Sequence, residues 1–405
     1  MRHVIVEPVI EQLTPSGRPT GRPPGRSRRI AVARPRTRAG EAAAVAGSGA
    51  EDADADGTLG PRTVAALTEA GFPRHFVPRR WGGRAGGFAE LFAAVAEVGE
   101  HCASAAWCAA LWAAHGRYAA RLPEAARREL WEASPDVRIS AAVVPPAGLA
   151  RPVHGGWSLR GRWSFASGVE HADWVLLAAR VEDDAADEGV CVCVVPRAQL
   201  TIDATWDAVG LRGTGSHSVS AEALFVPGRR SMSFGRMTCA RTASGSTRRS
   251  ALDAPAQLAG GLLMAAPALG AARAALAEWT RTAAAEPRGA APLDRSASAQ
   301  HVLARSTAQI EAAGLLLTRA ARRADSGPAD AAAVAANMRD AAFAADSLVE
   351  AVERLLRTGG AATRGRGGVL QRAWRDVHTL AAHGALRWEV AEAAYARSVQ
   401  AEPIR

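Results

Sequence analysis

Two ionisable side chains near the end of the chain have a spacing that could do chemistry. In the string RDVHTLAAHGAL, Asp376, Leu380 and His383 follow one another at intervals of four and three, so an unbroken helix would place them on one face. Burying a carboxylate and an imidazole is costly unless they meet a partner, a ligand or water. An imidazole also exchanges protons near neutral pH, as a general acid or base must. The alternative is a histidine that only packs in a helical bundle.

A second imidazole, His115, closes the apolar string CASAAWCAALWAAH and is followed by Gly116. This pattern predicts a histidine at the C-terminal end of a helix, where it would complement the helix dipole. That structural explanation is sufficient by itself. Contact with a substrate is the alternative.

Several hydroxyl groups lie at the ends of expected strands. Ser140 occurs in RISAAVVPP, Ser167 precedes a glycine in FASG, and Gly213 and Thr214 belong to GLRGTGSHSV. Serines before glycine usually form turns. A glycine-rich connection also allows backbone N–H groups to approach a ligand closely. Both interpretations stay open from the residues alone.

Composition excludes several classes of protein. The chain has 405 residues, 48% hydrophobic and 22% charged, as in a globular protein. It contains no lysine, which excludes a lysine Schiff base, pyridoxal phosphate attachment and a phosphate-binding loop with its lysine. Of the net charge of +9, +6 lies in residues 1–50, and the nearly balanced remainder argues against nucleic-acid binding.

The cysteines are odd in number and lack the spacing of a metal site, so we expect reduced thiols in a cytoplasmic protein and no metal. Two of them alternate on an apparent strand and are expected to be small core residues. The cysteines are Cys102, Cys108, Cys191, Cys193 and Cys239.

The apolar periodicity changes along the chain. Residues 1–56, rich in Pro, Gly, Arg and Ala, predict a disordered tail whose deletion would leave stability and activity nearly unchanged. A helical domain is predicted over 57–135 and a β-domain, an antiparallel barrel or sandwich, over 136–228. A linker at 229–254 then leads to helices over 255–405. The fold class is α+β, mainly α.

The C-terminal region predicts four long helices. The first covers nearly all of residues 254–272, which carry no charge and approach the length of a membrane span. Their Ala and Gly content favours a helix packed closely on other helices instead, and we expect no membrane segment. The helices are predicted at 255–283, 297–324, 329–358 and 369–398.

This order of elements, together with local strings, resembles the acyl-CoA dehydrogenase fold. Within that fold the chain resembles the flavin-dependent monooxygenases that hydroxylate phenols, the oxygenase components of two-component systems. The matching strings are FVPRRWGG, CASAAWCAALWAAH, GGWSLRGRWSFASGVEHADW, TWDAVGLRGTGSHSV and RDVHTLAAHGAL. The resemblance implies an N-terminal helical domain, a central β-domain and a C-terminal four-helix bundle, usually in a homotetramer. No G-x-G-x-x-G follows a strand, so no nicotinamide-binding unit is evident.

The resemblance also implies cofactors and partners. Reduced FMN or FAD would diffuse from a separate NAD(P)H:flavin reductase and react with dioxygen to a flavin hydroperoxide. The hydroperoxide would then hydroxylate a small aromatic substrate. The arginine-only, alanine-rich coding style is typical of actinomycetes, where such enzymes often tailor aromatic polyketides, and antibiotic biosynthesis is expected by that association alone.

The resemblance assigns roles to the candidate residues. His383 or His115 would take the phenolic proton or hydrogen-bond the hydroperoxide, with Asp376 orienting the imidazole. Where the dehydrogenases carry a catalytic glutamate, this chain has AAHGAL without a carboxylate, and Glu389 comes six residues after His383. The expected flavin contacts are Trp107, Ser140, Ser167, Gly213, Thr214 and, through the phosphate, Arg273.

Three rival functions remain from the sequence. The same fold supports N-hydroxylation of an amine or amino sugar, and it supports true acyl-CoA dehydrogenation. A non-catalytic scaffold is a rival of another class. Flavin binding distinguishes the scaffold, and the missing glutamate argues against the dehydrogenase.

Overall fold

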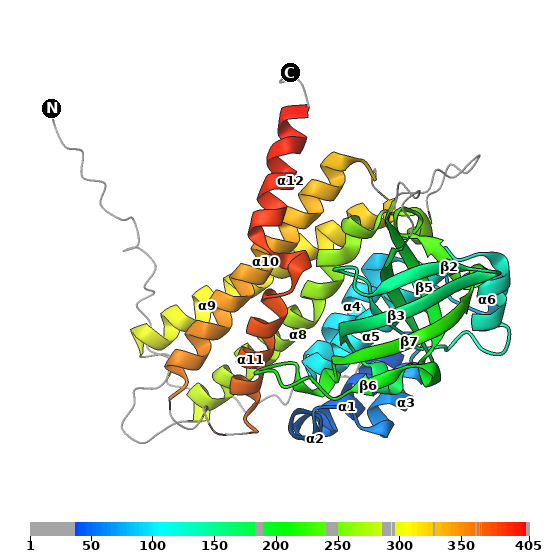
Figure 1. Ribbon diagram of the computed structural model, residues 1–405. Helices are drawn as coiled ribbons and strands as arrows, with labels where there is room; N and C mark the ends of the chain where they lie inside the picture. The colour runs from blue at the N-terminus through cyan, green and yellow to red at the C-terminus, as the bar shows by residue number, and fades with distance from the viewer. Residues whose placement is uncertain are drawn as a thin grey trace, which may run out of the picture. The chain divides into compact units, whose positions relative to one another are not determined.

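The computed structural model describes residues 37–182, 189–239, 250–285, 293, 296–326, 329–360, 363, 365 and 367–401. They all belong to one unit, Arg36–Arg405. Its first part is helical, as the sequence predicts (Figure 1). The helices are α1 (Arg38–Ser48), α2 (Ala50–Asp56), α3 (Pro61–Glu69), α4 (Phe88–Gly99), α5 (Ala103–Ala119) and α6 (Glu124–Trp131).

Helices α1 and α2 lie in the region that the sequence assigns to a disordered tail, and that prediction is wrong for residues 38–56. The Thr37 side chain caps α1 by accepting a hydrogen bond from the Gly40 amide at 2.9 Å. Alanine is the best helix former, and its small side chain lets a helix pack closely on a neighbour. The expectation for the residues before Thr37 lies outside the described residues. The buried alanines are Ala42, Ala43, Ala46, Ala50 and Ala53.

The central domain is one eight-stranded sheet in the order β6-β7-β3-β2-β4-β5-β8, with β1 paired to β4. The strands are β1 (Ile139–Ala142), β2 (Leu149–Val153), β3 (Gly156–Ala166), β4 (Trp174–Val181), β5 (Val190–Pro196), β6 (Thr201–Asp203), β7 (His217–Pro227) and β8 (Ser231–Ser233). The prediction of a wholly antiparallel domain is wrong, because β1 and β2 both run parallel to β4. They pair with successive parts of β4, and Pro145 and Pro146, which have no N–H to donate, lie between them.

Both faces of the middle of the sheet are buried, which explains why β4 and β5 are continuous apolar runs. Val175, Leu177 and Cys193 contribute to one hydrophobic cluster. Leu176 and Val192 contribute to another, shared with α6. Cys191 and Cys193 are buried core residues, which confirms the prediction, and all five cysteines are free thiols.

The C-terminal helices form a bundle, and α4 and α5 lie between it and the sheet (Figure 1). Three of the four predicted helices are present as continuous helices. The fourth is broken, because α11 ends at Ala381 and a short 3₁₀ turn at Gly384–Leu386 precedes α12. The helices are α8 (Ala256–Ala285), α9 (Ala297–Ser326), α10 (Ala331–Thr358), α11 (Val369–Ala381) and α12 (Trp388–Ala401).

Helix α8 is long and apolar enough to span a membrane by composition, but 83% of its most apolar window is buried inside the protein. It contacts α4, α5, α9, α10 and α11. This is the behaviour of a core helix, as the Ala and Gly content predicts.

The predicted linker at 229–254 is structured over its described residues. It contains β8, which pairs with β5, and the short helix α7 (Phe234–Thr238). The buried Arg121 guanidinium donates hydrogen bonds to the carbonyls of Leu252 at 3.0 Å and Ala254 at 2.6 Å. These bonds fix the entry into α8.

Candidate active site

A chain of buried hydrogen bonds joins three segments that are far apart in the sequence. The Trp107 indole N–H of α5 donates to Ser167 Oγ at 3.0 Å. Ser167 Oγ lies 2.7 Å from Ser216 Oγ, which lies 2.7 Å from Thr214 Oγ1. The Thr214 hydroxyl donates to the Leu211 carbonyl at 2.8 Å. We call Trp107, Ser167, Ser216 and Thr214 the hydroxyl chain.

The two ends of the hydroxyl chain determine its direction. An indole N–H only donates and a carbonyl only accepts, and each hydroxyl has one proton. Since Thr214 donates to the Leu211 carbonyl, Ser216 must donate to Thr214, and Ser167 must donate to Ser216. The proton of Ser167 is therefore in use, and this hydroxyl can only accept a further hydrogen bond.

Ser140 stabilises the backbone of the turn that carries Ser167, a member of the hydroxyl chain. Its fully buried hydroxyl donates to the Ser167 carbonyl at 2.9 Å and so holds the turn that carries Ser167. The structure thus brings Ser140, Ser167, Trp107 and Thr214 together. The flavin contacts expected for them stay predictions.

His383 stands beside this chain, at the break between α11 and α12. Its ring is edge-on to the Trp107 ring, with centroids 5.4 Å apart. Its Nδ1 accepts a hydrogen bond from the Ala385 amide at 3.2 Å. Desolvation by its neighbours lowers the pKa of His383, although the residue is exposed at the surface of the single chain. The neutral ring therefore carries its proton on Nε2, which makes that atom a hydrogen-bond donor.

His115 has the opposite tautomer. Helix α5 continues to Ala119, so His115 lies within the helix, and the expectation of a C-terminal histidine complementing the dipole is wrong. Its Nδ1 donates to the Ile139 carbonyl at 2.8 Å, which leaves Nε2 as an acceptor. Burial lowers the pKa of His115 to about 4, so the ring is neutral at physiological pH.

Asp376 does not orient His383. The carboxylate is buried in α11 and its Oδ1 accepts a hydrogen bond from the Leu211 amide at 2.6 Å. The predicted shared face is absent because α11 ends before His383. Burial raises the pKa of Asp376 to about 6. Asp376 therefore holds the loop that carries Thr214 and Ser216.

The raised pKa of Asp376 predicts a pH-dependent stability. Between its ordinary pKa of 3.8 and about 6, this carboxyl binds more protons in the folded than in the unfolded state. The free energy of unfolding should therefore fall as pH rises through this window, by about 3 kcal/mol, and no longer change above it. Asp376→Asn keeps the acceptor for Leu211 and should remove this dependence. Denaturant unfolding from pH 4 to 7 measures it, and parallel curves for the two proteins would contradict the assignment.

Two expected flavin ligands have other contacts in the structure. The half-exposed Arg273 side chain donates to Glu100 at 3.1 Å, so the structure does not bring it into the hydroxyl chain. Gly213 packs against α2, where an added Cβ would lie 2.9 Å from the Ala53 Cβ. Close approach to α2, a helix absent from the sequence prediction, is the physical reason for this glycine.

The sequence-based prediction misses three residues at this site, which are Ser216, Phe165 and Trp206. Ser216 is a central member of the hydroxyl chain, although it lies in the string that was singled out. Phe165 is 69% exposed, and its ring is edge-on to Trp206, with centroids 6.3 Å apart. A bulky residue at a φ of 64°, as Phe165 has, is an outlier of the kind that gathers at functional sites. That backbone signal is invisible in a sequence.

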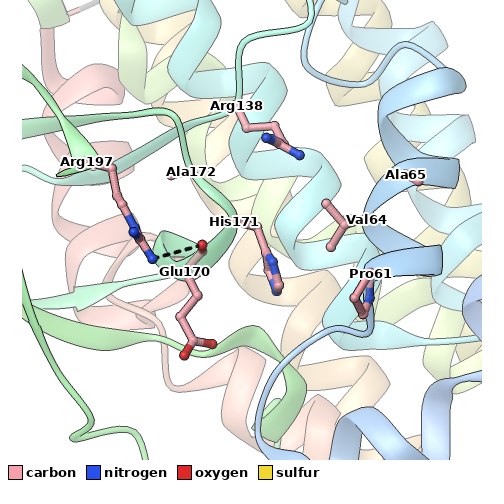
Figure 2. Close-up of a pocket in the computed structure, with 8 residues that line it drawn as sticks. All are labelled: Pro61, Val64, Ala65, Arg138, Glu170, His171, Ala172 and Arg197. Carbon is pink, nitrogen blue, oxygen red and sulfur yellow. Dashed lines mark hydrogen bonds between the residues drawn. The ribbon is translucent and has the colours of Figure 1, made fainter.

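A separate surface pocket of about 370 Å³ uses the turn that follows Ser167. In Figure 2 the His171 ring points toward α3, while the Glu170 carboxylate points away. The His171 Nε2 lies 3.1 Å from the Thr58 hydroxyl. The members of the hydroxyl chain do not line this pocket, which we do not assign to the active site. The pocket is lined by Pro61, Val64, Ala65, Arg138, Glu170, His171, Ala172 and Arg197.

Comparison with known proteins agrees with this architecture. Residues 262–388 match the family model of the acyl-CoA dehydrogenase C-terminal domain. The chain is 27% identical to 3-HSA hydroxylase from Rhodococcus sp. RHA1, with a TM-score of 0.82 over 91% of this chain and 97% of that chain. XiaF from Streptomyces sp., solved with FADH2 and glycerol, has 26% identity and a TM-score of 0.83 over 90% of this chain and 94% of that chain.

The chain belongs to the flavin-dependent monooxygenases of acyl-CoA dehydrogenase fold, as an oxygenase component. It is 30% identical to the FADH2-dependent resorcinol hydroxylase oxygenase component of Rhizobium sp., over 80% of this chain and 84% of the relative. It is also 30% identical to the oxygenase subunit HsaA of Rhodococcus jostii, over 80% of this chain and 87% of the relative. The predicted fold family and enzyme class are confirmed.

Proposed function

We propose that this monooxygenase hydroxylates a phenolic aromatic substrate, with reduced flavin bound against Ser167 and Trp107. The observation that carries the proposal is the directed hydroxyl chain beside the His383 ring. Relatives named for resorcinol and indole-3-acetate support an aromatic substrate. When bound, reduced flavin would supply the two electrons that activate dioxygen, so that one oxygen atom passes to the substrate and the other leaves as water.

The direction of the hydroxyl chain fits a reduced flavin. The N5 atom of reduced flavin carries a hydrogen and donates, whereas N5 of oxidised flavin only accepts. The Ser167 hydroxyl donates its proton to Ser216, so it can accept a hydrogen bond from N5–H of reduced flavin. It has no proton to offer N5 of oxidised flavin, which would stay without a partner. The exposed Phe165 and the partly buried Trp206 offer aromatic surface next to this turn for a flat ring system. A cofactor that must be reduced before it binds requires a separate reductase as partner.

The two histidines have different hydrogen-bonding roles: His383 is a donor and His115 is an acceptor. The His383 Nε2–H donates to the substrate oxygen or to the oxygen being transferred, because its Nδ1 is occupied by the Ala385 amide. The His115 Nε2 is an acceptor, and it takes the phenolic proton if the substrate reaches it. Burial lowers the pKa of His115 to about 4, so that ring is neutral at pH 7, and desolvation lowers the pKa of His383 as well.

Two rival enzymatic functions are weaker. An acyl-CoA dehydrogenase needs a carboxylate to remove a proton, and residues 382–387 contain none. Asp376 is bonded to the Leu211 amide instead. N-hydroxylation of an amine differs only in the substrate, and product analysis with phenols and amines separates the two.

The proposal predicts that reduced flavin binds about 5- to 150-fold more tightly than oxidised flavin, since a buried acceptor without a donor costs about 1–3 kcal/mol. Anaerobic titration with each form measures the ratio. Thr214→Val removes the acceptor that directs the hydroxyl chain, so Ser167 can donate and the ratio should shrink; Thr214→Ser is the matched control. A ratio unchanged in Thr214→Val would contradict the assignment.

Rapid mixing of the protein with reduced flavin and dioxygen tests the enzyme class. A transient absorbing species should precede the spectrum of oxidised flavin, and a phenol should be hydroxylated. Immediate appearance of oxidised flavin, together with direct reduction of bound flavin by an acyl-CoA, would favour the dehydrogenase. Failure to bind flavin in either redox state would favour the scaffold.

The resemblance also supports a homotetramer. Helices α9, α10 and α12 carry large apolar side chains that are exposed in the single chain, which is typical of surfaces buried on assembly. We propose that these helices meet partner subunits, and light scattering tests this. The side chains are Leu315, Phe343, Val390 and Val399.

A further inference from the structure

Residues 53–58, at the end of α2 and just after it, contact both segments that supply the hydroxyl chain. One segment is the loop 207–216, which carries Thr214 and Ser216. The other is the turn 167–172, which begins with Ser167. Because residues 53–58 contact both the loop and the turn, they can fix the distance between these two segments.

The strongest contact is an ion pair between α2 and α11. The Asp54 carboxylate accepts hydrogen bonds from both terminal nitrogens of Arg375, at 2.9 and 2.6 Å. The side chains are only 19% and 16% exposed, so water screens this two-point contact little. Arg375 also donates to the Val209 carbonyl at 2.8 Å. Asp54 therefore orients the arginine that holds one side of the loop.

The backbone of α2 holds the other side of the same loop. The Arg212 Nε donates to the Asp54 carbonyl at 2.8 Å. Gly213 approaches Ala53 so closely that an added Cβ would lie 3.0 Å from the Ala53 carbonyl oxygen. The loop is thus fixed at Val209 by the charged Arg375, at Arg212 by a hydrogen bond and at Gly213 by steric contact, all within seven residues of Ser216.

The turn with Ser167 has its own connection to this segment. The Thr58 hydroxyl lies 3.1 Å from the Nε2 of His171, whose ring points toward the start of α3 (Figure 2). Ser167 and Ser216 must stay 2.7 Å apart for the hydroxyl chain to persist. A shift of either segment relative to the other breaks that bond.

We infer that Asp54 is a positioning residue for the flavin site: its carboxylate, through Arg375, holds the loop that presents Thr214 and Ser216 to Ser167. The contact with Arg212 comes from the Asp54 backbone carbonyl, which the side-chain variants keep. Asp54 is not a member of the hydroxyl chain, and its hydrogen bonds are to Arg375 and Arg212. The inference rests on the proposed function, because it presumes that the hydroxyl chain binds flavin. It also gives α2 a function beyond packing.

The test compares Asp54→Ala and Asp54→Asn with the wild type in the full-length protein. Asp54→Asn keeps the side-chain volume and one acceptor oxygen but loses the charge. The control, Asp56→Ala, removes an exposed carboxylate two residues further along the same helix. The readouts are the dissociation constant for reduced FMN and FAD under anaerobic conditions and the ratio of peroxide to hydroxylated product. Melting temperature is recorded for every variant.

We expect both Asp54 variants to bind reduced flavin about tenfold more weakly and to release more peroxide, because small misplacements at a site cost up to about 10²-fold. Asp56→Ala should match the wild type. Thr58→Val, which removes the other connection, should give a smaller loss of the same kind, and Asp54→Glu should restore part of the affinity. These readouts follow loop position, which a merely stabilising residue would not change.

Two outcomes would count against the inference, and they are distinguishable. Equal flavin affinity and equal peroxide release in wild type, Asp54→Asn and Thr58→Val would overturn it and leave the proposed function intact. A wild type that binds no flavin would overturn the proposed function, and the inference with it.

Discussion

His383→Ala is expected to lower the rate of oxygen transfer by about 10²-fold or more and to divert the oxygen to hydrogen peroxide. The physical reason is the loss of a positioned N–H donor. The Ala385 amide occupies Nδ1 of His383, so the proton of the neutral ring lies on Nε2. The ring is held edge-on to Trp107, the first member of the hydroxyl chain. Flavin binding should change little, because the hydroxyl chain is intact in the variant.

The variant His383→Gln distinguishes two possible roles of His383, that of a hydrogen-bond donor and that of a general base. The glutamine amide places an N–H group near the position of Nε2, but it cannot accept a proton as an imidazole does. If His383 acts as a donor, the glutamine variant should retain much of the coupling between oxygen use and product. If it takes the phenolic proton, glutamine should be as poor as alanine. The ratio of hydroxylated product to peroxide measures this.

Asp376 offers a further control on His383. Since its carboxylate bonds the Leu211 amide and not the imidazole, Asp376→Asn should not reproduce the peroxide release of His383→Ala. Should His383 only pack between helices, alanine would lower the free energy of unfolding by about 1 kcal/mol and leave the product ratio unchanged. That result would remove His383 from the mechanism.

Deletion of residues 1–56 is expected to destabilise the protein severely, opposite to the prediction from composition. Helices α1 and α2 bury five alanines, and their methyl groups alone contribute about 0.8 kcal/mol each, or about 4 kcal/mol together. Typical proteins are stable by only about 5–15 kcal/mol. The deletion also removes Asp54 and so releases the loop around Gly213. Thermal unfolding and flavin titration measure the two effects.

Deletion of residues 1–36 alone is the matched control. Its Pro- and Arg-rich composition still predicts little effect on the melting temperature. An unchanged melting temperature after removal of residues 1–56 would contradict the packing of α1 and α2 described above.

Much of the architecture was predictable because it depends on local patterns. The change from a helical period to a period of two and back marks the three regions, and each pattern reports which side chains face a core. The strings around Trp107, Ser167 and Thr214 could be singled out for the same reason. Helices α1 and α2 were missed because Pro and Arg in the preceding residues dominated the composition, while the helical signal was only a run of small alanines.

The direction of the hydroxyl chain, the tautomers of the two histidines and the partner of Asp376 were decided only by the tertiary structure. Each depends on a contact that local periodicity does not encode: Leu211 and Asp376 are 165 residues apart, and Asp54 and Arg375 are 321 apart. The sequence by itself determined the order of elements, the enzyme class by resemblance, and the residue types available for chemistry. Which atom donates and which accepts follows from how helices and loops meet, because a proton is placed by its partner and not by its position in the chain.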